Sequence, residues 1–306
     1  MDRLLWMHCF VRSVETGSFT AVARELGIGQ PNVSRHVASL EEYLGTRLLY
    51  RSTRKLTLTP EGERYFAETR PTLDAINEAE STARGENMPQ GLLRVACAVS
   101  LGVERVVPLL RTFLTRYPKI DVELQISDRY IDLVEEGVDV AIRGGVLKDS
   151  ALKARRIGTS ERACVATPAY LAEYEAPKIP EDLLKHNCIL YTLLATGNVW
   201  PFLGTDVAVQ GRFRVNSPDG IKRAVLDSIG VGYVPVWLFR DELRDGRVQP
   251  LLLDFPSPPV PIHILYPAKR LLSQRASVFM DFVAESFAKE PTLNEGSLAY
   301  LLSSRM

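Results

Sequence analysis

Residues 10–62 read FVRSVETGSFTAVARELGIGQPNVSRHVASLEEYLGTRLLYRSTRKLTLTPEG, and this stretch decides the fold of the N-terminal part of the chain. Its apolar residues recur at spacings of three and four, and glycines separate the runs, which predicts short helices. Ser18 is a natural N-cap for the second helix. Pro31 falls in the first turn of the third, where a missing N–H costs little. Two helices joined by a tight turn form a unit that lays one helix into a DNA groove.

The third predicted helix, from about Gln30 to Leu44, has two unlike sides. Its apolar stripe consists of Val33, Val37, Leu40 and Leu44, and its other side carries Pro31, Ser34, Arg35 and Ala38. The following residues, 48–59, form two β-prone runs around a basic tip, which predicts a hairpin wing. From residue 35 to 55, five basic side chains stand against two acidic ones. This local excess suits contact with phosphates by one face of the module.

The whole-chain composition sets limits on the protein class. At 306 residues the chain is long enough for about two domains. Its formal net charge is zero, which argues against a protein that coats nucleic acid indiscriminately. The N-terminal run MDRLLWMHCFV lacks the pattern of a secretory signal. No apolar run approaches the roughly 18 residues of a membrane helix, so a cytoplasmic location is expected.

Four cysteines, Cys9, Cys97, Cys164 and Cys188, are far apart and show no Cys-x-x-Cys spacing. Neither a zinc site nor a disulfide framework is therefore indicated, and no metal or other cofactor is expected. Buried thiols are the favoured interpretation. A redox switch is the less favoured alternative, because a reactive thiol requires an electropositive and partly exposed position.

Pro60 is expected to open a long helix that continues to about residue 84. Along it, Phe66, Thr69, Leu73, Ile76, Glu80 and Ala83 alternate at spacings of three and four. This pattern predicts a short two-helix packing seam with weak positions, interrupted at Pro71. A dimerisation helix is favoured, and a helix packed on its own domain is the alternative.

Beyond residue 91 the pattern changes to α/β. The runs LLRVACAV, KIDVELQI and VDVAIRGG are predicted strands, and the segments between them, LGVERVVPLLRTFLTRYP and DRYIDLVEEG, are predicted helices. Such alternation implies a mainly parallel sheet. A second unit of the same kind begins around residue 161, and the strand PIHILYP with the helix that follows returns to the first unit. Two lobes joined by two crossovers make a hinged cleft. The tail from Glu290 has little periodicity and is expected to be weakly ordered.

The motif GSFTAVARELGIGQPNVSRHVASLEEYLGTRLLYRSTRKLTLTPEG resembles the winged helix-turn-helix of LysR-type transcriptional regulators. The later runs LRVACAVS, FLTRYPKIDVEL, VDVAIRGG and SIGVGYVPVWL are similar to the effector domain of that family. The resemblance covers about residues 2–288. It implies an N-terminal winged helix-turn-helix, a long linker helix and a two-lobed, periplasmic-binding-protein-like α/β effector domain.

The resemblance also implies boundaries for these parts. The DNA-binding domain is expected at 1–59, with the helix-turn-helix at about 19–38 and the wing at about 48–59. A linker and dimerisation helix with a hinge follows at 60–90. The effector domain is expected at 91–289, with lobe I at about 91–162 and 265–289 and lobe II at about 163–264. Residues 290–306 form a C-terminal tail outside the resemblance.

The residues expected to read DNA come from the third helix and the wing. Gln30 matches adenine, Pro31 a thymine methyl, and Arg35 guanine or the backbone. Wing arginines suit a narrow minor groove. The full expected set is Ser18, Thr20, Gln30, Pro31, Asn32, Ser34, Arg35, Arg47, Arg51, Thr53, Arg54 and Lys55. A solvated polar face on an ordinary helix is the alternative, as is a simple helix cap for Ser18.

The expected effector contacts lie at turns that face the cleft. Ser100 precedes a helix whose free N–H groups suit an anion. Arg143 ends a strand and is interpreted either as a bidentate hydrogen-bond donor to a ligand carboxylate or as a partner in a structural pair. Trp237 is expected either to close the apolar side of the cleft or to belong to the core. The full expected set is Val99, Ser100, Leu101, Gly102, Arg143, Gly144, Asn216, Ser217, Asp219, Val234, Pro235 and Trp237.

The resemblance implies a switch in which a small effector changes the arrangement of the lobes and so of paired DNA modules. The expected partners are double-stranded promoter DNA, an effector that is a candidate anion, and other copies of the chain in a homodimer or homotetramer. RNA polymerase is a further candidate. The alternative function is a two-lobed small-molecule-binding protein without a transcriptional role. An enzyme is not expected, because the four histidines are dispersed and no catalytic motif accompanies them.

Overall fold

A computed structural model describes residues 2–51, 56–85, 88–129, 131–134, 136–145, 152–268 and 272–303, with Arg51 and Thr82 described by their backbone alone. The chain forms two compact units. One contains residues 1–89 with the short segments 131–138 and 269–274, and the other contains the rest. In the described segments, none of the helices combines the length and apolar character needed to cross a bilayer.

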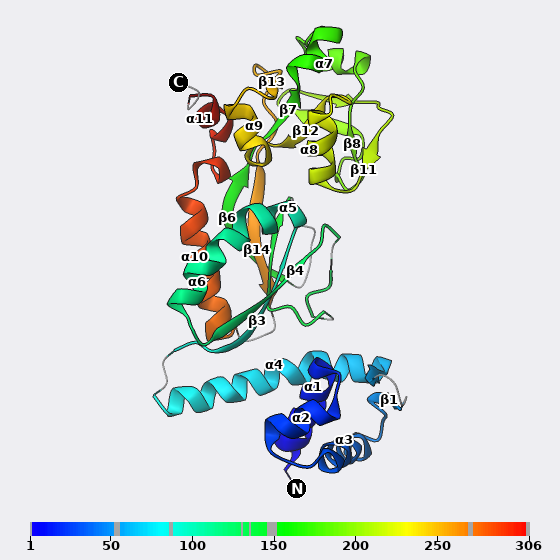
Figure 1. Cartoon of the computed structure of the whole chain (residues 1–306), viewed down its shortest axis with the longest axis vertical. Helices are drawn as coiled ribbons and strands as arrows, with labels where there is room; N and C mark the ends of the chain where they lie inside the picture. The colour runs from blue at the N-terminus through cyan, green and yellow to red at the C-terminus, as the bar shows by residue number, and fades with distance from the viewer. Residues whose placement is uncertain are drawn as a thin grey trace. The chain divides into compact units, whose positions relative to one another are not determined.

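The first unit begins with three helices, α1 (Arg3–Thr16), α2 (Phe19–Leu26) and α3 (Gln30–Leu44) (Figure 1). Gly17, Gly27 and Gly45 end them in the left-handed conformation, with φ values of 64°, 65° and 68°. Glycine is favoured there because it has no Cβ to clash with the backbone. The Ser18 hydroxyl accepts a hydrogen bond from the Ala21 amide at 3.3 Å, which confirms the predicted N-cap.

A shared core joins these helices to the wing and to the long helix. Val33, Val37 and Leu40 are buried along α3, as the apolar stripe predicted, and they pack with Phe10 of α1. The wing strands β1 (Leu49–Arg51) and β2 (Leu56–Leu58) pair antiparallel, with Leu49 opposite Leu58. The predicted hairpin is therefore present, and its tip lies outside the described residues.

Helix α4 (Pro60–Ala83) follows the wing directly. It continues through Pro71, so this proline does not end the helix, although it lacks the N–H that would bond one turn back. Two of its aromatic rings, those of Tyr65 and Phe66, lie 5.7 and 6.4 Å from the Phe10 ring, and Leu73 is buried in the same core. The first part of α4 is thus packed on its own module.

Lobe I of the second unit is built on a five-stranded sheet. Its order is β4-β3-β5-β14-β6, with bounds β4 Ile120–Ile126, β3 Gly91–Cys97, β5 Val140–Gly144, β14 Val260–Pro267 and β6 Leu152–Ser160. Strand β3 pairs parallel with β4 and β5, but β14 pairs antiparallel with both β5 and β6. The expectation of a mainly parallel sheet is wrong, because the strand that returns from lobe II enters the sheet in the opposite direction.

Two helices cover one face of this sheet, and both contribute aromatic rings to the core. They are α6 (Val107–Arg116) and α10 (Gln274–Ala288), which lie side by side in Figure 1. The Phe113 ring of α6 meets the Phe279 ring of α10 edge to face at 5.2 Å. A short helix, α5 (Val99–Leu101), and a π-helical turn, η1 (Gly102–Val106), lead from β3 into α6.

The predicted helix DRYIDLVEEG is wrong over its described residues, which form turns between β4 and β5. The Asp132 carboxylate accepts a hydrogen bond from the Val134 amide at 2.8 Å, and the Asp132 carbonyl accepts one from the Glu136 amide at 3.0 Å. Gly137 then adopts a φ of 64°. The aspartate side chain and the glycine stop the turn before a helix can extend.

Lobe II lies between β6 and β14 in the sequence and has its own sheets. Its antiparallel sheet has the order β12-β7-β13, with bounds β12 Gly232–Pro235, β7 Arg162–Ala166 and β13 Gln249–Leu251. Smaller pairs are the hairpin β9 (Val199–Phe202) with β10 (Thr205–Ala208) and the parallel pair β8 (Leu190–Tyr191) with β11 (Arg214–Val215). The helical elements are α7 Pro168–Glu173, η2 Pro180–Lys185, α8 Pro218–Leu226, η3 Val236–Phe239 and α9 Arg240–Arg244.

The lobes are joined twice. Glu161 is the single residue between β6 and β7, and the chain returns through residues 252–259 to β14. Strand β14 begins at Val260 and belongs to the lobe I sheet along its whole length. The return to lobe I therefore comes about five residues before the boundary expected at 264/265.

The C-terminal tail is ordered where the structure describes it, so the expectation of a weakly ordered extension is wrong. It forms a 3-10 turn, η4 (Pro291–Leu293), and a helix, α11 (Ser297–Ser303). Leu293 and Leu301 are buried. The Glu161 carboxylate accepts hydrogen bonds from the Gly296 amide, the Ser297 hydroxyl and the Leu298 amide at 2.7, 2.9 and 3.0 Å. These tertiary contacts stabilise a segment too short to be stable alone.

Candidate DNA-reading helix and interlobe pocket

Helix α3 presents a polar face to solvent. Gln30, Pro31, Ser34 and Arg35 are exposed, while Val33 between them is buried in the core of the module. Asn32 is half-buried and its side-chain oxygen accepts a hydrogen bond from the Arg35 guanidinium at 3.0 Å. This bond spans one helical turn and orients the guanidinium along the face. The arrangement leaves amide, hydroxyl and guanidinium groups available for base edges.

Three further residues expected at DNA belong to the same module. Thr20 and Arg47 are exposed, whereas the Ser18 hydroxyl is engaged as the cap of α2. Gly29 precedes α3 and offers it no side-chain cap. Of the expected wing contacts, Thr53, Arg54 and Lys55 lie outside the described residues, and the side chain of Arg51 does as well.

Glu41 holds the wing to helix α3, a role that was not predicted from the sequence. This residue is 8% exposed, and its carboxylate accepts hydrogen bonds from the amides of Leu48 and Leu49 at 2.8 and 3.1 Å. It thereby fixes the start of the wing relative to the end of α3. A signal was present in the sequence, since an acidic residue stands directly beside the apolar stripe, one position after Leu40.

A cavity of about 140 Å³ lies between the two lobes and is named here the interlobe pocket. Lobe I and lobe II both contribute to its wall. The lining residues are Ala98, Ser100, Leu101, Asp128, Gly144, Ser160, Arg162, Tyr191, Leu194, Pro218, Ile221, Tyr233, Pro235, Trp237, Val260 and Ile262. Most are apolar or aromatic, and a few polar groups converge on them, as is typical of a small-molecule site.

Arg162 supplies the cationic side chain of this wall. Removal from water lowers the pKa of its guanidinium. The hydroxyl of Tyr233 opposes part of this shift. The guanidinium carbon lies 5.8 Å from the centroid of the Tyr233 ring. Among the described residues, the groups that favour its charge are the hydroxyls of Tyr233 and Tyr191, and no carboxylate is among them. A desolvated cation in this situation favours an anionic partner.

Arg143, the other arginine considered for a ligand, is occupied elsewhere. It is 8% exposed, and its guanidinium donates to the carbonyls of Ser127 and Arg129 at 2.5 and 2.9 Å. It ties the end of β5 to the turn after β4 and does not line the interlobe pocket. Its neighbour Gly144 does line the pocket, with open space where a Cβ would stand.

Ser100 and Asp219 meet across the lobes. The buried Ser100 hydroxyl donates to the Asp219 carboxylate at 2.7 Å, and Ser100 and Leu101 line the pocket. Two neighbours serve the turn itself. The Val99 amide donates to the Asp128 carboxylate at 2.9 Å, and Gly102 packs against Cys97 with no room to spare for a larger side chain.

The remaining expected contacts fall into two groups. Pro235 and Trp237 line the pocket, and Trp237 also belongs to the core, where its indole N–H donates to the Ser160 hydroxyl at 3.0 Å. Asn216, Ser217 and Val234 do not line it. Asn216 is exposed, Ser217 caps α8 by accepting from the Gly220 amide at 3.4 Å, and Val234 is fully buried.

Several residues that line the pocket were not predicted from the sequence, because tertiary structure brings them there. Arg162 and Ser160 flank the crossover, while Tyr191 and Ile221 come from separate elements of lobe II. No local pattern singles them out. An arginine at the start of a strand, immediately after the crossover residue Glu161, was the one available signal.

All four cysteines are buried, as expected. Burial raises the pKa of the thiol to about 11 in Cys9 and to about 12 in Cys97 and Cys188, and raises that of Cys164 well above its usual value. Such thiols are poor nucleophiles at neutral pH. Across the described chain, no group of three or more His, Cys, Asp or Glu side chains is arranged to hold a metal ion.

A helix-turn-helix module with a wing, followed by a two-lobed domain that encloses a pocket, defines a ligand-regulated DNA-binding protein as the class. Both domains match models of one protein family. The bacterial regulatory helix-turn-helix of the lysR family matches residues 4–63, and the LysR substrate binding domain matches residues 86–288. The chain belongs to the LysR family of bacterial transcriptional regulators. Members of this family are not enzymes.

Individual relatives agree over nearly the full length. A transcriptional repressor of Pseudomonas aeruginosa is 35% identical, with 99% of this chain and 98% of the relative covered. The transcriptional activator AaeR of Escherichia coli is 33% identical, with 94% and 95% covered. The solved structure of CrgA, a LysR-type regulator from Neisseria meningitidis, has a TM-score of 0.61 at 34% identity and covers 92% of this chain and 97% of its own.

Proposed function

We propose that this LysR-type regulator is switched by a small anionic effector bound in the interlobe pocket. The observation that carries the proposal is the Arg162 guanidinium, which lines the pocket, is desolvated, and has tyrosine hydroxyls as the described groups that favour its charge. A carboxylate is the best match, because it accepts two parallel hydrogen bonds from a guanidinium.

The rest of the wall suggests the body of the effector. Tyr191, Ile221 and Trp237 offer apolar and aromatic surface around a cavity of about 140 Å³. This volume suits a molecule of about one ring with a short substituent, and the aromatic lining favours a planar ligand. The proposed class is therefore a small aromatic or unsaturated carboxylate.

Binding between the lobes would bias their arrangement. The hydrogen bond from Ser100 to Asp219 joins the lobes next to the pocket, so a ligand that strengthens or displaces it binds one arrangement better than another. Only such a difference in affinity moves the equilibrium. In the proposed switch, the lobes of paired chains then change the spacing or angle of their DNA modules on the promoter.

The same proposal includes the expected DNA contacts and assembly. Ser18, Thr20, Arg47 and the wing residues are proposed to hold the phosphate backbone, and the α3 face to read bases. Gly144, Pro235 and Trp237 are proposed effector contacts, together with Ser100 and Leu101. A homodimer or homotetramer in the cytoplasm, with RNA polymerase as a further partner, completes it. The family relatives include both a repressor and an activator.

Benzoate titrated into the full-length protein tests the effector class, with a thermal shift and calorimetry as readouts. We expect saturable stabilisation of the wild type and its loss in R162A, because the variant removes the cation but leaves the cavity. R162K should retain part of the affinity, since the lysine ammonium keeps the positive charge but cannot form the two parallel hydrogen bonds of a guanidinium. R223A removes an exposed arginine of lobe II and serves as the control. Equal stabilisation of wild type and R162A would overturn the assignment.

A solute-binding protein without a transcriptional role is the second candidate. It shares the two-lobed domain, but it leaves the polar face of α3 and the buried Glu41 clamp without a purpose. A specific operator for the full-length protein separates the two candidates.

A further inference from the structure

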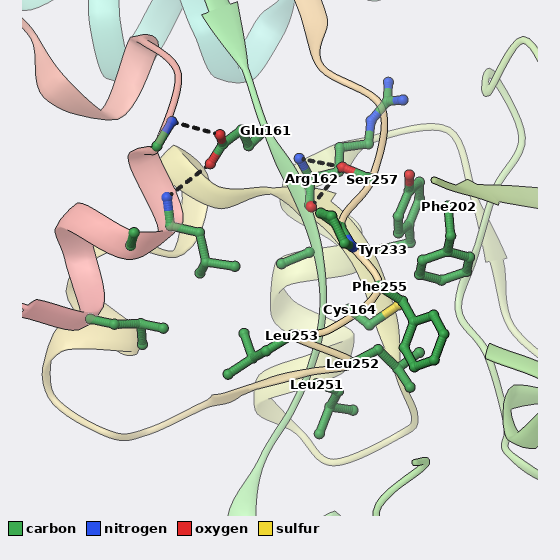
Figure 2. Close-up of a pocket in the computed structure, with 16 residues that line it drawn as sticks. Glu161, Arg162, Cys164, Phe202, Tyr233, Leu251, Leu252, Leu253, Phe255 and Ser257 are labelled. Atoms are coloured by element: carbon green, nitrogen blue, oxygen red, sulfur yellow. Dashed lines mark hydrogen bonds between the residues drawn. The ribbon is translucent and has the colours of Figure 1, made fainter. Parts of the chain in front are cut away.

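A second and larger cavity, of about 350 Å³, lies beneath the C-terminal helix and is named here the tail pocket. Its walls are α11, with Leu298, Ala299 and Leu302, strand β7, and the segment that follows β13 (Figure 2). All of α11 lies beyond residue 288, where the match to the LysR substrate binding domain ends. The cavity is thus built partly from a segment outside the match to that domain.

Apolar side chains dominate this cavity. Leu251, Leu252, Leu253 and Phe255 converge on it with Phe202 from β9, as Figure 2 shows. Leu253 is 53% exposed although it is a large apolar residue. A concave apolar surface left open to water is typical of a binding site, because the apolar area gains free energy when a ligand covers it.

The polar groups at the rim already have partners. The Glu161 carboxylate accepts its bonds from Gly296 and from the first residues of α11. The Ser257 hydroxyl donates to the Arg162 carbonyl at 2.8 Å, and the Tyr233 hydroxyl donates to the Pro201 carbonyl at 2.8 Å. The Arg162 guanidinium points away from the leucines in Figure 2. Glu161 is thus already bonded, and the Arg162 guanidinium is directed away from the leucines, so the apolar part of the described wall matches an uncharged ligand.

The backbone at the cavity carries strain. Leu252 has a φ of 57°, a conformation that side chains other than glycine and asparagine rarely adopt. The strain is maintained while Leu252 is held inward among the cavity walls, where it is 8% exposed. Such strain persists only where the surrounding structure fixes one conformation. The packing that holds Leu252 inward therefore also fixes the segment after β13 at the cavity wall.

The tail also contacts both lobes. Before α11, Glu290 approaches the Arg105 guanidinium of lobe I to 3.6 Å, and that guanidinium donates to the Trp237 carbonyl of lobe II at 3.0 Å. Within α11, Ser297 and Leu298 bind the crossover residue Glu161. A ligand wedged under α11 therefore touches the segment that spans the connection between the lobes.

We propose that the tail pocket is a second ligand site, that it takes a neutral apolar small molecule, and that α11 transmits its occupancy to the crossover at Glu161. The two cavities share Arg162 and Tyr233 in their walls, but the leucines and phenylalanines of the tail pocket line that pocket alone, so its binding step is tested separately from the interlobe effector site. The regulatory consequence rests on the proposed function, because it acts through the same arrangement of lobes.

The test uses the neutral fluorescent probe N-phenyl-1-naphthylamine and the full-length protein. We expect saturable binding with one site per chain. A299W fills the cavity from its exposed rim and should weaken binding by about tenfold or more, which corresponds to losing most of the apolar contact. Y300W adds an indole at the next position, outside the lining, and should bind like the wild type.

Two further variants keep the result decisive. L253E places a charge on a half-exposed rim residue, where folding tolerates it, and should also weaken binding. Arg162 lines both cavities, but its guanidinium points away from the leucines. R162A should therefore weaken probe binding less than A299W does while it removes benzoate binding, so failure of the interlobe site and failure of the tail pocket are distinguished. Absence of saturable binding, equal binding by wild type, A299W and L253E, or loss of probe binding in R162A alone would each overturn the proposal.

Discussion

The Ser100 hydroxyl of lobe I donates a hydrogen bond of 2.7 Å to the Asp219 carboxylate of lobe II. Ser100 is buried and precedes η1, and Asp219 lies in the first turn of α8. A direct side-chain bond between lobes at the edge of the interlobe pocket links the position of α8 to that of the turn after β3. In the proposed switch, this bond is the contact that an effector strengthens or displaces.

The variant S100A removes this bond and should shift the balance between lobe arrangements by about 1 kcal/mol, or roughly fivefold, because the carboxylate is exposed and returns to water. Calorimetric affinity for benzoate and the melting temperature of the full-length protein measure the effect. D219N keeps a side-chain oxygen as acceptor and should show a smaller change. No difference between wild type and S100A in either measurement would contradict a role in coupling the lobes.

The Glu41 carboxylate should be a major source of stability for the DNA module. E41A leaves the buried Leu48 and Leu49 amides without their acceptor, which costs about 1–3 kcal/mol for an unsatisfied buried group. Thermal unfolding followed by circular dichroism measures the loss. E41Q retains one oxygen and should lose less. If E41A and the wild type have the same melting temperature, the hydrogen bonds of Glu41 are not required to hold the wing.

His186 should make stability depend on pH. Burial lowers the pKa of its imidazole, with Asp182 acting in the opposite sense and Lys185 in the same sense. The Tyr170 hydroxyl lies 3.3 Å from its Nδ1 atom. Because the unfolded chain binds the proton more readily, stability is full above the unfolded pKa of about 6.5 and is lost as the pH falls toward the folded value.

The unfolding midpoint of wild type and H186Q, measured between pH 7.5 and 5.5, tests this effect. The wild type should lose up to about 1.4 kcal/mol per pH unit through this group. H186Q should lose less, while His263, whose pKa burial and Arg156 also lower, keeps part of the dependence. Parallel pH curves for the two proteins would show that His186 does not contribute.

The local features of the fold could be predicted from the sequence, and the distant contacts could not. Helix α3 and its glycine boundaries follow from spacing and backbone preference alone. The interpretation of 128–137 as a helix failed because Asp132 and Gly137 favour a turn. The tail appeared irregular because α11 depends on Glu161, a residue more than a hundred positions earlier.

The lining of the interlobe pocket likewise depends on contacts between residues distant in the sequence. Arg143 and Arg162 both stand at strand ends, and nothing in the local sequence separates them. The structure engages Arg143 with the carbonyls of Ser127 and Arg129 and puts Arg162 in the wall of the interlobe pocket. Which arginine is available depends on how the turn after β4 packs, and this is a tertiary property.

The measurement that tests the account most directly is operator selection from random DNA with the full-length protein, followed by affinity at a fixed salt concentration for the selected and a scrambled sequence. We predict an enriched motif that the wild type prefers by about a thousandfold or more. R35A should lose about 5- to 150-fold of operator affinity and relax the preference at its base, and R223A should bind like the wild type. Failure to enrich any motif, or an R35A protein with unchanged affinity and preference, would contradict the assignment of α3 as the DNA-reading helix.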